Sequence, residues 1–168
     1  MDFPIPGGSN AVKGSVTDHL PSASQPLLHS QAPSVTLASP TVRFLDNSMG
    51  DGVRTLRARV TGPSGASLLT VTTHAQIMGA TIDGVGVPNI RDEDKGEAGW
   101  NLTYWSPPPE GFELILTIAD GEPVTVTATA GAPELPAIPG GPYRDRPPHM
   151  MPIAEDTTMV SKSFSPRS

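Results

Sequence analysis

Apolar and polar side chains alternate with a period of two residues along most of the chain after residue 40. In the stretch 53–61, for example, Leu56 and Val60 alternate with Arg57 and Arg59. A period of two is typical of β-strands that bury one face. The pattern predicts strands at 41–46, 53–61, 67–74, 77–83, 85–90, 100–105, 112–118, 124–130 and 158–164.

Two irregularities accompany this alternation. The period slips by one residue near Thr55, which predicts a β-bulge in that strand. The segment 33–40 has prolines at both ends and is a further candidate for a short edge strand, because proline is tolerated at sheet edges.

Turn signals separate the strands about every 8–12 residues. Gly62-Pro63-Ser64-Gly65, Asp83-Gly84 and Asp120-Gly121 each predict a β-hairpin. No helical period lies between the strands. The predicted fold class is therefore all-β, an antiparallel β-sandwich of immunoglobulin-like or jelly-roll-like type with about 7–9 strands. Its expected core residues are Val42, Phe44, Leu56, Val60, Leu69, Val71, Ile77, Ile82, Leu102, Tyr104, Phe112, Leu114, Leu116, Ile118, Val124 and Val126.

Two segments depart from the strand pattern. Residues 1–36 are rich in proline and serine and have few large apolar side chains, so we expect a disordered linker or tail. Residues 37–166 are the predicted sandwich domain. Within it, the proline-rich segment 131–157 predicts an extended strap that packs over the sandwich, anchored by Leu135, Ile138, Tyr143, Met150 and Met151.

Composition narrows the possible partners. The net charge of −6 and scattered basic residues argue against nucleic-acid binding, which rewards clusters of lysine and arginine. We expect no membrane span in the chain, because no run approaches about 18 apolar residues. We expect no signal peptide in it, because no basic segment followed by an apolar run opens the chain. The chain has no cysteine, which excludes disulfides and thiolate chemistry.

The histidines and serines of the chain show no catalytic motif. None of the four histidines has metal-ligand spacing, and no Gly-x-Ser-x-Gly motif occurs. We therefore expect no catalytic residue and no cofactor. Asp92, Glu93 and Asp94 are weak candidates for a metal site, but the neighbouring Arg91 and Lys95 favour a solvated, locally neutralised loop.

Ligand-binding candidates lie in two places. In the strand 100–105, Trp100 and Tyr104 share the core face, and Trp105 points to the other side, where a tryptophan can stack on a sugar ring. The alternative is that Trp105 covers a sheet edge beside the prolines at 107–109. In the strap, the candidates are Arg144, Arg146 and His149, and the alternative is that salt bridges and two methionines pin the strap.

Several short motifs occur in an order that resembles one known family. They are Arg54-Thr55-Leu56-Arg57-Ala58-Arg59, Gly62-Pro63-Ser64-Gly65-Ala66, Gly79-Ala80-Thr81-Ile82-Asp83-Gly84, the segment from Trp100 to Tyr104, Pro109-Glu110-Gly111-Phe112-Glu113-Leu114 and Arg146-Pro147-Pro148-His149-Met150-Met151-Pro152, with a close at 156–164. Over about residues 33–164 the chain resembles the C-terminal extracytoplasmic domain of bacterial membrane-bound zinc exopeptidases of the aminopeptidase Y type, relatives of the endoplasmic-reticulum metallopeptidase.

The resemblance implies a periplasmic β-domain whose partners are the peptidase domain and membrane helices of a parent protein. The zinc ligands of that family have no counterpart in this sequence, so no catalytic residue carries over. The expected function is a non-catalytic accessory domain that supports packing, stability or substrate access. An independent carbohydrate- or peptide-binding module is the alternative, and a small hydrolase of unknown type is a third reading.

Overall fold

A computed structural model describes residues 12–15, 27–29, 34–87, 99–119, 123–133, 136 and 157–166. The chain divides into two compact units. One comprises Met1–Leu37 and Pro133–Thr158, and the other comprises Ala38–Ala132 and Met159–Ser168. The second unit contains nearly all of the sandwich.

The first unit contains a small antiparallel sheet. Strand β1 (Val12–Gly14) pairs with β2 (Leu27–His29), so that Val12 lies opposite His29. The sequence did not predict these two strands. The candidate edge strand at 33–40 was wrong, since residues 34–40 lie outside any strand. The prolines at its two ends lack the N–H that a ladder needs.

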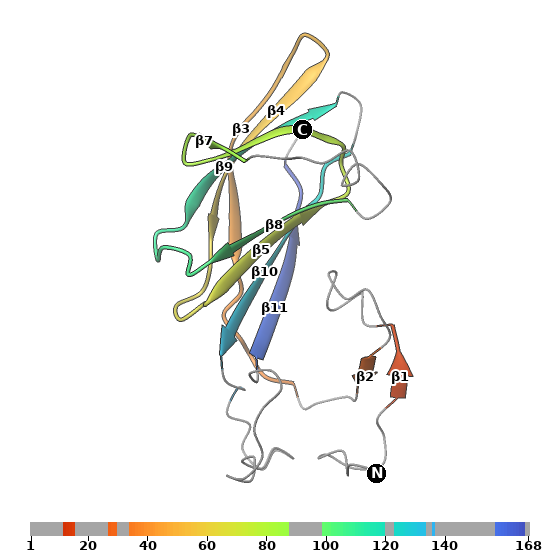
Figure 1. Ribbon diagram of the computed structural model, residues 1–168, viewed down its shortest axis with the longest axis vertical. Coiled ribbons are helices and arrows are strands. Elements are labelled where there is room, and N and C mark those ends of the chain that lie inside the picture. Colours follow the sequence, from red (N-terminus) through yellow and green to blue (C-terminus); the bar gives the residue numbers. More distant parts are fainter. Residues whose placement is uncertain are drawn as a thin grey trace. The chain divides into compact units, whose positions relative to one another are not determined.

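The sandwich consists of two antiparallel sheets, which confirms the predicted fold class (Figure 1). The five-stranded sheet has the order β3 (Thr41–Gly50), β4 (Val53–Thr61), β9 (Phe112–Ala119), β6 (Ile77–Ile82) and β7 (Val85–Gly86). The four-stranded sheet has the order β11 (Thr157–Phe164), β10 (Val126–Pro133), β5 (Leu68–Thr73) and β8 (Trp100–Trp105). Within the described ranges there is no helix that could cross a membrane.

The core lies between the two sheets, as the alternation predicted. Every residue expected to point inward is either buried or packed against the buried cluster. The sequence prediction underestimated small residues, because alanines fill the gaps between larger side chains. The buried alanines that the sequence prediction left out are Ala58, Ala75, Ala80, Ala128 and Ala130.

The turns are where structure and prediction differ most. Asp83-Gly84 forms the predicted hairpin between β6 and β7, and both residues have positive φ angles (47° and 80°) as a tight hairpin turn requires. The other two predicted hairpins were wrong. The segment 62–67 leads from β4 in one sheet to β5 in the other, and β9 and β10 also belong to different sheets.

A further hairpin was not predicted. Asp51 and Gly52, with φ angles of 52° and 72°, join β3 to β4. The predicted bulge was also misplaced. The pairing of β4 with β9 is regular through Thr55, whereas the register of β3 against β4 shifts between Phe44 and Asp46. The extra residue is Leu45, in the edge strand, where bulges are common.

Candidate binding face

The outer face of the four-stranded sheet carries mostly hydroxyl side chains. We call it the threonine face and define it by its outward residues. They form rows across the strands: Trp105, Leu68 and Gly131 in the first, Thr103, Thr70 and Thr129 in the second, and Asn101, Thr72 and Thr127 in the third, with Met159, Ser161 and Ser163 on β11. None of these side chains is charged.

Hydroxyl groups on this face pair across neighbouring strands. The oxygens of Thr70 and Thr103 lie 3.1 Å apart, those of Thr127 and Ser163 lie 2.8 Å apart, and those of Thr129 and Ser161 lie 2.7 Å apart. Each hydroxyl has one proton to donate and two lone pairs. The face therefore has hydrogen-bonding capacity left after these pairs form.

Removing one of these hydroxyls from the buried part of the face should cost measurable stability. Thr129 is 4% exposed, so Thr129→Val is expected to lower the free energy of unfolding by about 0.5–1.5 kcal/mol through loss of its bond to Ser161. The exposed Thr103→Val is the matched control, and its loss should be smaller because water replaces the bond. Urea denaturation compares the two, and equal losses would contradict this account.

The first row of the threonine face is apolar. Trp105 is 70% exposed and Met159 is 37% exposed. Leu68 lies between Trp105 and Gly131 in the register, and a Cβ built on Gly131 would lie only 2.8 Å from Cγ of Leu68. The glycine thus allows Leu68 to lie flat against β10, beside the exposed indole.

The other rings of β8 point into the sandwich, as the sequence indicated. Trp100 is 4% exposed, and Tyr104 stacks on Phe112 with ring centroids 4.9 Å apart. Trp105 faces the opposite side of the strand. Among the described strands, β8 lies at the edge of its sheet.

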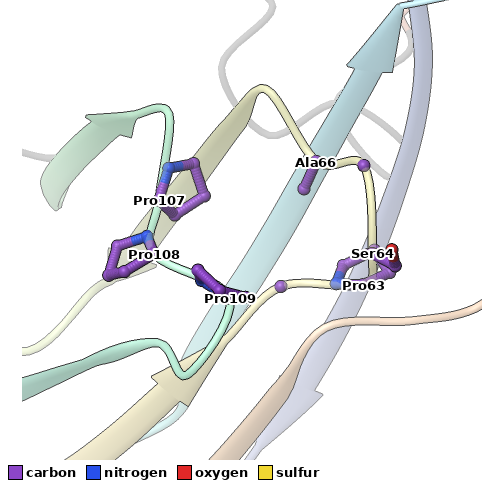
Figure 2. A pocket seen from close by; sticks show the side chains of 8 residues that line it. Pro63, Ser64, Ala66, Pro107, Pro108 and Pro109 are labelled. Carbon is purple, nitrogen blue, oxygen red and sulfur yellow. The ribbon is translucent and has the colours of Figure 1, made fainter.

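A shallow pocket of about 320 Å³ lies between the loops that flank β5 and β8 (Figure 2). Pro107, Pro108 and Pro109 line one side, and residues 62–66 line the other. The backbone N–H of Ser106 donates to the carbonyl of Ser67 at 2.8 Å and holds the two loops together. Sequence reasoning missed this pocket because it took 62–65 for a hairpin turn; the runs of proline and glycine were the available signal.

The outer face of the five-stranded sheet differs in being charged. Nη2 of Arg57 donates to Oε2 of Glu113 at 2.7 Å, and Arg59 lies 3.9 Å from a carboxylate oxygen of Asp83. The hydrogen bond to Glu113, followed by the charge of that carboxylate, raises the pKa of Arg57. These charged side chains pair with one another, and among the residues that the structure describes the exposed aromatic ring lies on the threonine face.

The remaining predicted site residues lie outside the described residues. These are Asp92, Glu93 and Asp94 in one loop and Arg144, Arg146 and His149 in the strap. The predicted anchors of the strap also lie outside the described residues. Among the residues that the structure describes, no three histidine, aspartate or glutamate side chains come together as a metal site.

Comparison with known proteins gives no relative. No family model matches the chain, and no curated protein or solved structure matches it.

Proposed function

We propose that this chain is a non-catalytic accessory domain that contacts other molecules through the threonine face. The observation that carries the proposal is the 70% exposure of Trp105 on a face whose described side chains are uncharged. An indole offers roughly 150–250 Å² of surface that gains free energy when it is covered. A core that closes without Trp105 leaves this ring available for contact.

The parent protein that we propose is a membrane-associated zinc exopeptidase. The support is the ordered set of motifs over about residues 33–164, now joined by the β-sandwich fold. In such a protein the domain lies on the extracytoplasmic side. Its partners are the peptidase domain and the membrane helices, and it contributes to packing, stability or substrate access.

The absence of catalysis is tested directly on the purified chain. We expect no release of p-nitroaniline from leucine p-nitroanilide, with or without added Zn²⁺, because no zinc-ligand spacing occurs in the sequence. A zinc-dependent release that scales with the concentration of the chain and disappears with a chelator would overturn the proposal.

A second candidate function is an independent carbohydrate- or peptide-binding module. The rows of hydroxyl side chains beside Trp105 favour it, since binding sites combine an exposed ring with a few polar groups that fix orientation. The two candidates differ in what Trp105 contacts. In the first it is another part of the parent protein, and in the second it is a separate ligand.

A further inference from the structure

We infer that the threonine face binds a linear, uncharged polysaccharide, with one sugar ring stacked on Trp105 and the following rings over β5 and β8. This inference rests on the second candidate function and names its ligand. It follows from the exposed ring, from the pattern of hydroxyl groups and from the absence of charge on the described part of the face.

The exposed indole supplies the stacking surface. The face of an aromatic ring carries negative charge density, which attracts the weakly positive C–H groups of a pyranose. Leu68 lies beside Trp105 in the register, and it widens the apolar platform at the start of the face. A sugar ring can therefore stack here without burying a charge.

The next two rows along β5 and β8 supply polar contacts. Thr70 lies opposite Thr103, and Thr72 lies opposite Asn101. Successive outward residues on a strand are about 6.8 Å apart, so these rows continue from Trp105 in the direction of the strands. Hydroxyl and amide groups both donate and accept, and they match the sugar hydroxyls, which do the same.

The absence of basic side chains argues against a negatively charged polymer as the ligand. A polyanion needs lysine or arginine contacts, and the described side chains of the threonine face provide none. The net charge of −6 also opposes the approach of a polyanion. An uncharged polysaccharide has no charged groups that need a partner of opposite charge, so a face without charged side chains does not weaken its binding.

The test is isothermal titration calorimetry with cellohexaose, xylohexaose and maltohexaose as neutral probes and hexagalacturonate as the acidic probe. At least one neutral hexasaccharide should bind to the wild-type chain. Trp105→Ala should weaken that binding at least about tenfold, which corresponds to about 1.4 kcal/mol. Thr70→Val should weaken it about 2- to 10-fold through loss of one hydrogen bond.

The matched control is Met78→Ala. Met78 is 58% exposed but lies on β6 of the other sheet, so its removal should change binding by less than about twofold if the threonine face is the site. Thermal unfolding of each variant checks that the fold is retained. Because Trp105 is largely exposed, Trp105→Ala should unfold close to the wild-type temperature.

Three results would overturn the inference: no neutral hexasaccharide binds, Trp105→Ala binds as well as the wild type, or hexagalacturonate binds as tightly as the neutral probes. A neutral peptide, acetyl-(Gly-Ser-Val)₃-amide, separates this failure from that of the underlying function. If the peptide binds in a Trp105-dependent manner and no saccharide does, the inference fails and the binding module stands. If neither the peptide nor a saccharide binds, both fail.

Discussion

Replacing Phe112 by alanine is expected to lower the free energy of unfolding by about 3–5 kcal/mol. Phe112 is 0% exposed, begins the central strand β9, lies opposite Val60 in the register, and stacks on Tyr104 from the other sheet. The ring therefore joins the two layers of the sandwich at one end. Small domains have a total stability of about 5–15 kcal/mol, so this one change should remove a large part of it.

The measurement is urea denaturation followed by far-ultraviolet circular dichroism. Ile115→Ala is the matched control, because Ile115 lies on the same strand but points outward and is half-buried. Its loss should be about 1 kcal/mol. If the two variants lose equal stability, Phe112 does not hold the central position that the structure assigns to it.

Replacing Gly111 by alanine is expected to cost at least about 2–4 kcal/mol. Gly111 has a φ angle of 74°, and a Cβ there would overlap the carbonyl oxygen of Val60 and lie 2.6 Å from Oγ1 of Thr61. The left-handed backbone conformation alone costs an L-residue about 1–2 kcal/mol, and the overlap forces β4 and the start of β9 apart. The backbone N–H of Gly111 also donates to the carbonyl of Pro108 at 2.8 Å.

Gly65→Ala separates the two contributions. Gly65 has a similar φ angle of 82°, but no atom lies within 4 Å of the Cβ position. Its substitution should cost only about 1–2 kcal/mol, the conformational part. Thermal unfolding of both variants should show the larger decrease for Gly111→Ala, and a larger decrease for Gly65→Ala would contradict the close approach to Val60.

The strands and the core of the sandwich were predictable from the sequence, because the alternation of apolar and polar residues shows which side of a strand is buried. The pairing was not. The same turn sequences suit a hairpin within one sheet and a crossing from one sheet to the other, as in Gly62-Pro63-Ser64-Gly65 and Asp120-Gly121. Local composition does not distinguish a hairpin from a crossing. Asp51-Gly52 is the reverse case, because this dipeptide does form a hairpin, between β3 and β4, that the sequence analysis did not predict.

The candidate site was predictable only in part. Trp105 is separated from Trp100 and from Tyr104 by an odd number of positions, so the alternation of a strand places it on the opposite face. The structure confirms this outward direction. The hydroxyl rows did not follow, because they depend on which strands are neighbours and in what register. Thr70, Thr103 and Thr129 are far apart in sequence and become one row only when β8, β5 and β10 pair.

The central claim about binding is that the threonine face is the surface that takes up an uncharged polysaccharide. It is tested most directly by ¹⁵N nuclear magnetic resonance of the chain titrated with cellohexaose, xylohexaose and maltohexaose. We expect the shifts to move at the indole N–H of Trp105 and at amides of β5 and β8, while the indole of the buried Trp100 and the charged face around Arg57 stay unchanged. Shifts concentrated on the five-stranded sheet, or no shifts with any of the three sugars, would contradict the claim.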